Sequence, residues 1–313
     1  MQLKGKALFL WAMAVAFAQS PYTPDWQKAA GGRMSFEVAS VKPTKVPPPP
    51  SPVLAGEART PGGRLSVTAT LDMLINFAYK LRASPEQERI LTHLPQSVSG
   101  FYEIEAKAAG NPTKDQMRLM MQSLLADRFK LKVHFETRDA AVFILRPVRS
   151  GQIGPKLRRH DKGLPCPDTD PPLDPFAQRS AGEAFPPSCG IVQLRQTRGM
   201  RLIGARDITM ASLADAIYTS GNTAGEVERP VLDGTGLEGR FDFTLEFAPG
   251  ENDRLKRSFL PFSSERTAEA QPPDSEGPTF LDAVRKQLGL KLAPDRGAIQ
   301  VLVVDQVERP SEN

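Results

Sequence analysis

The stretch RPVLDGTGLEGRFDFTLEF, residues 229–247, decides how the fold of the whole chain is assigned. A short apolar run enters a glycine-rich turn, and a strongly alternating run leaves it. Apolar residues fall on one face, at Phe241, Phe243, Leu245 and Phe247, and polar residues fall on the other, at Asp242, Thr244 and Glu246. A period of two predicts a half-buried antiparallel strand whose polar side chains face solvent.

A second copy of this phrase, GFYEIEAK, occupies residues 100–107. The interval from Tyr102 to Phe241 equals the interval from Thr70 to Thr209, and each of these threonines precedes an amphipathic helix. Later in each copy, the phrase FKLKV at 129–133 returns as LGLKL at 288–292, at a longer interval because the second copy carries an insertion. We therefore predict an α+β protein built by tandem duplication of a β-α-β-α-β-β module, with small antiparallel or mixed sheets.

Composition divides the chain into five predicted segments. They are a signal peptide (1–18), an N-terminal strand with a Pro-rich connector (19–62), a first repeat (63–148), a Pro-rich linker with both cysteines (149–198) and a second repeat (199–310). The insertion in the second repeat is the polar stretch 249–278, which we expect to be mobile.

The pattern also predicts individual elements. In the first repeat we expect helices over 71–81 and 113–128, a polar loop over 83–97, and two strands over 129–137 and 141–148 joined by a tight hairpin at Arg138-Asp139. The second repeat should end in a strand over 298–307 that is buried on both faces.

The segment 1–18 has the pattern of a secretory signal peptide. Lys4 and Lys6 form a basic start, an apolar run covers Ala7–Val15, and the small-x-small site at Ala16–Ala18 predicts a mature start near Gln19. An uncleaved N-terminal anchor is the alternative. No later stretch approaches the ~20 apolar residues that a spanning helix needs. We expect an exported protein, periplasmic or secreted.

The charge of the chain gives no reason to expect nucleic acid. The formal charge is +4, and removal of the signal, which carries two lysines and no acid, lowers it to +2. The densest basic run, KLRRH at 156–160, is expected to be a solvated loop. We expect the partner to be a protein or a component of the cell envelope, and the oligomeric state stays open.

The chain has two cysteines, Cys166 and Cys189. An even pair in an exported chain indicates a disulfide, here in proline-rich sequence where a covalent link replaces a missing core. A redox or metal-binding role is the less favoured alternative, because no CxxC and no paired histidine accompanies the cysteines.

The phrase GTGLEG at 234–239 matches the dinucleotide-binding pattern G-x-G-x-x-G. That site needs a helix after the glycines, so that the helix N-terminus faces the pyrophosphate. A strand is predicted here instead, and we interpret the glycines as a turn between two strands.

No other pattern predicts a catalytic, cofactor-binding or metal site. HExxH and GxSxG are absent, and the three histidines, His93, His134 and His160, are scattered. His134 is interpreted as a structural residue of a strand. The spacing of Asp72, Asp127, Asp215 and Asp233 does not support acid–base chemistry.

Four phrases, FEVASVKP (36–43), LLADRFKL (124–131), DGTGLEGRFDF (233–243) and QLGLKL (287–292), carry a resemblance over residues 36–310. The chain resembles a family of uncharacterised exported proteins, defined as a domain of unknown function and expanded in Acidobacteria-type soil bacteria. The resemblance implies export and no established activity. Related domains look to be appended to membrane metallopeptidases of the β-lactam-sensor type, which implies a sensory or binding role.

Each repeat is also similar to the N-terminal signalling domain of secretins and TonB receptors, through TMASLA at 209–214 and LGL at 288–290. This second likeness implies a small interaction module that uses sheet edges and helix faces.

The favoured hypothesis is an exported, non-enzymatic, two-module binding or sensing protein whose strand edges recruit partners. A periplasmic sensor acting on a membrane partner is a variant of it. The alternative is a hydrolase or carbohydrate-active enzyme with a site between the repeats. A deep cleft there, with two or more convergent acidic or histidine side chains, would favour the enzyme.

Overall fold

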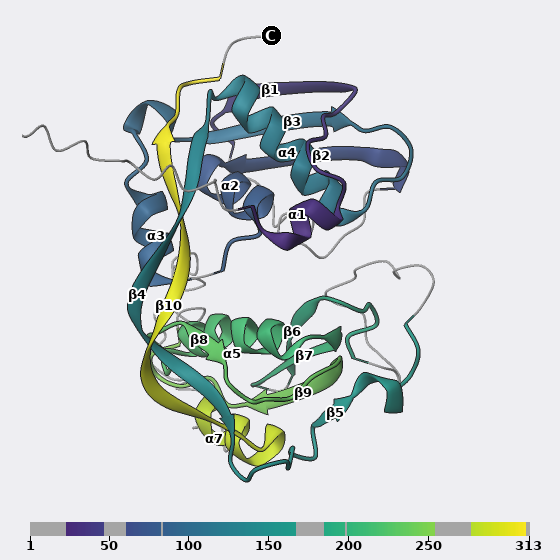
Figure 1. Cartoon of the computed structure of the whole chain (residues 1–313), viewed down its shortest axis with the longest axis vertical. Helices are drawn as coiled ribbons and strands as arrows, with labels where there is room; N and C mark the ends of the chain where they lie inside the picture. Colours follow the sequence, from purple (N-terminus) through teal and green to yellow (C-terminus); the bar gives the residue numbers. More distant parts are fainter. Residues whose placement is uncertain are drawn as a thin grey trace, which may run out of the picture.

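The computed structural model describes residues 23–46, 61–82, 84–166, 185–197, 199–253 and 277–310. The predicted signal peptide at 1–18, the proline run at 47–52 and most of the insertion at 249–278 lie outside these residues. The described residues form a mixed α+β structure with small antiparallel and mixed sheets, as predicted. Figure 1 shows two lobes, which we call the upper lobe (the described residues between 23 and 131) and the lower lobe (the described residues between 148 and 289).

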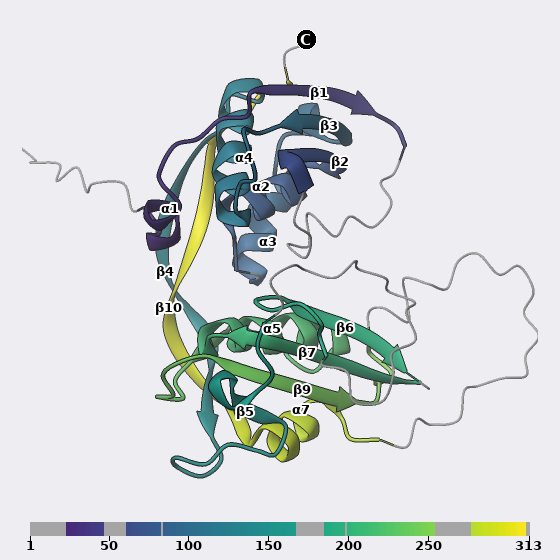
Figure 2. The ribbon, with the colours of Figure 1, turned by 90° about the vertical axis from the view of Figure 1, so that its right-hand side faces the viewer.

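The upper lobe is an antiparallel sheet covered by helices. Its strands lie in the order β1 (Val38–Thr44), β3 (Phe101–Lys107), β2 (Arg64–Thr70), and its helices are α1 (Asp25–Ala29), α2 (Leu71–Tyr79), α3 (Pro85–Thr92) and α4 (Lys114–Arg128). Helix α4 begins with a capping box at Thr113 and Gln116. The apolar faces of α2 and α4 share one core with the inward residues of β2 and β3, and both helices lie between the sheet and two long strands in Figure 2.

The lower lobe is a four-stranded antiparallel sheet with its own core. Its strands lie in the order β5 (Leu157–Arg159), β9 (Phe241–Phe247), β7 (Met200–Ile208), β6 (Val192–Thr197). Helix α5 (Met210–Ala224) is capped by Thr209, as predicted, and α7 (Phe280–Ala283) continues into the π-helical turn η4 (Val284–Leu288). The four apolar residues of β9 are all buried in this core.

The two lobes are joined by a long antiparallel ribbon of two strands, β4 (Lys132–Pro147) and β10 (Leu290–Gln306), which runs along one side of both lobes (Figure 1). Strand β8 (Val231–Asp233) adds to β4 in parallel. Each ribbon strand starts in one lobe and ends in the other: Leu145 of β4 is buried in the lower core, and Leu302 of β10 is buried in the upper core.

The predicted hairpin at Arg138-Asp139 is therefore wrong, because both predicted strands belong to the single strand β4. Asp139 lies opposite Ala298 in β10, and its carboxylate pairs with Arg296. The predicted terminal strand at 298–307 is likewise the second half of β10. Positions 138 and 139 lack the Gly or Asn that a two-residue hairpin favours. Strand β10, distant in sequence, supplies the backbone hydrogen bonds for β4.

Two predicted irregular segments contain regular structure. The polar loop predicted over 83–97 holds α3, which begins with Ser84 accepting a hydrogen bond from the Gln87 amide and with Pro85 at its first position. The predicted linker over 149–198 contributes β5 and β6 to the lower sheet. The side chain of Thr70 precedes α2, as predicted, but makes no capping hydrogen bond.

Candidate functional site

The two predicted site residues, Cys166 and Cys189, form a disulfide, which confirms that prediction. The bond ties the segment after β5 to the segment before β6, and its cysteines are 23 residues apart in sequence. A link of this length is expected to stabilise the fold by about 3 kcal/mol through the unfolded chain.

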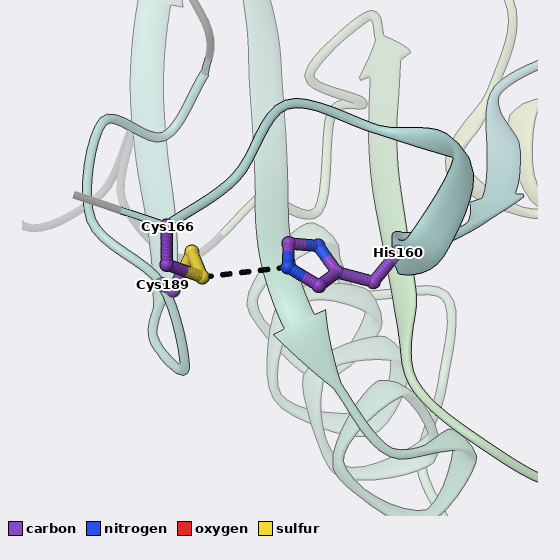
Figure 3. Close-up of side chains that lie close together, drawn as sticks. All are labelled: His160, Cys166 and Cys189. Atoms are coloured by element: carbon purple, nitrogen blue, oxygen red, sulfur yellow. Dashed lines mark hydrogen bonds between the residues drawn. A yellow bond between two sulfur atoms is a disulfide. The ribbon is translucent and has the colours of Figure 1, made fainter.

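A histidine lies directly against this disulfide, although no sequence pattern predicted one there. His160 Nε2 is 3.4 Å from Cys166 Sγ, and Figure 3 shows the imidazole ring pointing at the sulfur. The other ring nitrogen, Nδ1, is 2.6 Å from Asp242 Oδ1. His160 follows β5 and Asp242 lies in the neighbouring strand β9, so the sheet pairing of these two strands brings them together.

Asp242 was expected on the solvent face of its strand, and that expectation is wrong, because the residue is only 3% exposed. The segment after η3 (His160–Lys162) covers it so closely that a Cβ at Gly163 would lie 2.3 Å from Asp242 Oδ2. The alternation of β9 is real, but a segment far away in sequence buries the outer face as well.

A bulge in β7 completes the surroundings of Asp242. Between the pairs Ala205–Phe243 and Ile208–Phe241, β7 has one residue more than β9, and Asp207 adopts a positive φ of 54°. The amide of Asp207 donates to Asp242 Oδ1 at 3.0 Å. The guanidinium of Arg240, hydrogen-bonded to the Asp207 carboxylate, lowers the pKa of that carboxyl.

Arg206, in the same bulge, orders the two segments that carry the cysteines. Its guanidinium donates to the carbonyls of Leu164 and Pro165 on one segment and of Pro187 on the other. The buried Arg206 side chain thus binds both segments that carry the cysteines, through three of their backbone carbonyls.

A separate cavity of about 620 Å³ lies between the lobes. From the upper lobe it is lined by the start of α2, by α3 and by the turn that follows; from the lower lobe it is lined by α5, through Tyr218, Thr219, Asn222 and Thr223. Figure 2 shows α3 directly above α5. Small-molecule sites occur preferentially at such junctions between domains.

The lining of this cleft combines polar and apolar side chains and carries no positive charge. Hydroxyl groups, amides and two carboxylates, those of Asp72 and Glu88, alternate with apolar side chains such as Leu91. None of the described lining residues is Lys, Arg or His. The upper wall is fixed, because the side-chain amide of Gln87 makes two hydrogen bonds with the backbone of Leu302 in β10. The cleft therefore suits uncharged or positively charged ligands that present both polar and apolar surface.

One ion pair also joins the lobes. Arg82 Nε lies 3.5 Å from Asp215 Oδ1 in α5. Burial raises the pKa of Asp215 to about 6, and Arg82 opposes this rise. The Asp215 side chain keeps 39% of its surface exposed, so solvent screens part of both effects.

The remaining residues singled out from the sequence lie apart from these sites. The glycine-rich phrase connects β8 to β9, and Asp233 Oδ1 accepts from the Thr235 amide within it, so its interpretation as a turn between strands is confirmed. His134 lies in β4, as predicted, with Asp305 and Glu136 as hydrogen-bonding partners.

A family model describes most of this chain. The match covers residues 72–307, from α2 to the end of the ribbon, and its description is "protein of unknown function (DUF3738)". The chain belongs to the DUF3738 family. No curated protein and no solved structure matches the chain. The helices among the described residues are all too short or too polar to traverse a bilayer.

Proposed function

We propose that this DUF3738 chain is an exported binding protein that holds a ligand between its two lobes and releases it unchanged. The observation that carries the proposal is the cleft, whose walls come from both lobes. A ligand seated there contacts α3 and α5 at the same time, so its binding energy depends on how the lobes are held together.

The ribbon makes such a cleft adjustable. The lobes are linked by two paired strands, and the middle of the ribbon has its own small apolar cluster, which contains Ala140, Val142, Ile299 and Val301. Two-lobed proteins close around ligands by bending a few connecting residues. The ribbon residues between the two large cores are the candidates for this bending.

The lining selects the chemical class of the ligand. Hydroxyl and amide groups hydrogen-bond neutral polar molecules, and the carboxylates of Asp72 and Glu88 favour positive charge over negative. We infer that the ligand is an uncharged or cationic molecule with both polar and apolar surface, such as an oligosaccharide or a short basic peptide.

We further infer that the lobes are two copies of one module. Ala69 pairs with Tyr102 in the upper lobe, and Ile208 pairs with Phe241 in the lower lobe, so both partners are displaced along the sequence by the same interval. Two glycines that precede these strands at the same interval both have a positive φ, at positions 100 and 239. We also propose a sensing role for the bound state, which the expected resemblance of each repeat to the secretin and TonB-receptor signalling domain implies.

Export is supported by the N-terminal pattern and by the disulfide, since disulfides persist in oxidising compartments. The alternative function, a hydrolase or carbohydrate-active enzyme, is favoured by the two carboxylates in the cleft. It predicts turnover of the bound ligand, whereas the binding proposal predicts that the ligand is recovered intact.

A thermal-shift screen of neutral oligosaccharides, basic peptides and acidic peptides tests the proposal. We expect a neutral or basic compound to raise the melting temperature of the wild type, and Thr219→Trp, which fills the cleft, to abolish the shift. Thr137→Trp, at an exposed ribbon position, is the matched control. Stabilisation by acidic peptides alone, or an equal shift in Thr219→Trp, would contradict the proposal. Ligand cleavage that Asp72→Asn and Glu88→Gln abolish would favour the enzyme.

A further inference from the structure

The group of side chains around the disulfide has a chemical arrangement that a simple covalent link does not need. His160 Nε2 faces Cys166 Sγ at 3.4 Å, while its Nδ1 is held 2.6 Å from the carboxylate of Asp242. We propose that Cys166 and Cys189 form an exchangeable disulfide that oxidises a protein dithiol, with His160 stabilising the Cys166 sulfur as it leaves.

The position of the imidazole is fixed by buried partners. Asp242 Oδ1 accepts from His160 Nδ1 and also from the Asp207 amide, and Asp242 Oδ2 lies 3.4 Å from Arg158 Nε. A carboxylate that accepts from Nδ1–H directs Nε2 outward in the tautomer that can accept a proton. Here Nε2 is directed at sulfur.

The charged groups around the ring come from three strands. Arg158 of β5 and Asp242 of β9 pair with each other, and Arg206 and Asp207 of β7 lie in the adjoining bulge. Asp207 is paired with Arg240, and Asp242 is the carboxylate that contacts the imidazole ring of His160. A thiolate formed at Cys166 therefore faces His160 and not an acidic side chain.

The site is accessible to another molecule. The His160 side chain is 18% exposed, and both cysteines are partly exposed. A disulfide buried in the core would be closed to an attacking thiolate, whereas exposed disulfides are the labile ones.

The exchange has two steps. A partner thiol gives up its proton to His160 Nε2, and its thiolate attacks Cys189 Sγ; the bond between the two cysteines breaks, and Cys166 leaves as a thiolate beside the imidazolium. The second partner thiolate then attacks the partner sulfur of the mixed disulfide and releases Cys189. Two electrons pass from the partner dithiol to the cysteines, and the two thiol protons of the partner end on Cys166, or on His160 beside it, and on Cys189.

The full-length mature chain tests this in two ways, of which the first needs no substitution. Reduced glutathione is added, free thiols are trapped with iodoacetamide, and the labelled cysteines are mapped by mass spectrometry. We expect glutathione on Cys189 and iodoacetamide on Cys166. Glutathione mainly on Cys166 would overturn the proposal.

The second test measures the rate of reduction by dithiothreitol between pH 5 and 9. We expect reduction at pH 6 to be at least about tenfold slower in His160→Gln than in the wild type, because a neighbouring histidine stabilises the Cys166 thiolate as it leaves, and a better-stabilised thiolate leaves faster. His134→Gln, which removes another carboxylate-bonded histidine, should match the wild type.

Circular dichroism establishes that each variant keeps its fold. In Cys189→Ser, the free Cys166 should react with iodoacetamide at pH 6, and in Cys166→Ser the free Cys189 should react much more slowly. Equal reduction rates in folded His160→Gln and wild type would overturn the proposal. So would tight uptake of one zinc ion by the reduced chain, through the ligand set His160, Cys166 and Cys189, with loss of exchange.

Discussion

The same alternating strand pattern occurs in the upper and lower lobes, but one of its polar positions is exposed in the upper lobe and buried in the lower lobe. Glu103 of β3 and Asp242 of β9 occupy the same alternating position in the two copies of the phrase, yet Glu103 is exposed and Asp242 is buried. The inward residues of both strands are buried in much the same way. The difference arises on the outer face. In the lower lobe the segment after η3 covers this face at Asp242, whereas no described residue of the upper lobe buries Glu103.

The strand next to each of these also differs. Strand β2 pairs with β3 in unbroken register, whereas β7 bulges opposite Asp242 and points the Asp207 amide at its carboxylate. The alternating pattern therefore accounts for the buried inner faces of β3 and β9. The segment after η3 and one extra residue in β7 create the polar surroundings of Asp242 in the lower lobe.

The largest expected effect concerns the ribbon, which supplies each core with residues from the other half of the chain. Leu145→Ala should destabilise the lower lobe and Leu302→Ala the upper lobe, each by about 2–5 kcal/mol, since both side chains are fully buried. Hydrogen exchange should quicken in α5 and β9 for the first variant and in α2 and α4 for the second. The reverse assignment would contradict the crossing of the two strands between the lobes.

The disulfide lies in the lower lobe only, so its loss should destabilise the lower lobe and leave the stability of the upper lobe unchanged. Cys166→Ser combined with Cys189→Ser should lower the free energy of unfolding by about 3 kcal/mol. Urea denaturation gives the total, and hydrogen exchange should place the change in β5, β6 and β7. Equal loosening of β1–β3 would contradict a local role.

Substitution of the two matching acids measures the difference between the outer faces. Asp242→Asn should cost about 1–3 kcal/mol, because it weakens the contacts with His160, Arg158 and the Asp207 amide. Glu103→Gln, on the exposed face, should change stability by less than about 0.5 kcal/mol. Similar losses at both sites in urea denaturation would show that the two outer faces are not different.

The smallest effect is a pH dependence at Asp215, whose counterpart under the proposed duplication is Asn76. The pKa of Asp215 is raised to about 6 in the folded chain, so the folded state binds more protons and stability falls as pH rises from about 4 to 6. Asp215→Asn should remove this loss of stability, which amounts to less than about 1 kcal/mol once solvent screening is included.

Thermal unfolding at pH 4, 5, 6 and 7 measures this effect. Asn76→Asp, at an exposed position, is the reciprocal control and should leave the pH profile as it is. An unchanged profile in Asp215→Asn would show that burial does not control this carboxyl.

Local pattern was enough to predict most of the cores. The period of two in β9, the helical spacing in α4 and α5 and the cap at Thr209 were all visible in the sequence and are confirmed. Helix α3 was missed although its signal was present, since Ser84 followed by Pro85 and Gln87 is a helix start.

Features that depend on distant partners were not predictable in this way. The continuous strand β4 exists because β10, near the other end of the chain, pairs with it through Arg138-Asp139. The contact between His160 and Asp242 depends on the pairing of β5 with β9, and the cleft depends on the relative placement of α3 and α5. The local sequence of each of these segments does not show which distant segment will lie next to it.

The central claim is that both lobes contribute to one ligand site. Hydrogen–deuterium exchange of the wild type, with and without the compound that raises its melting temperature most, tests this claim directly. We expect slower exchange in α3 of the upper lobe and in the last turns of α5 of the lower lobe at the same ligand concentration. Protection confined to one lobe, or to strand edges away from the cleft, would contradict it.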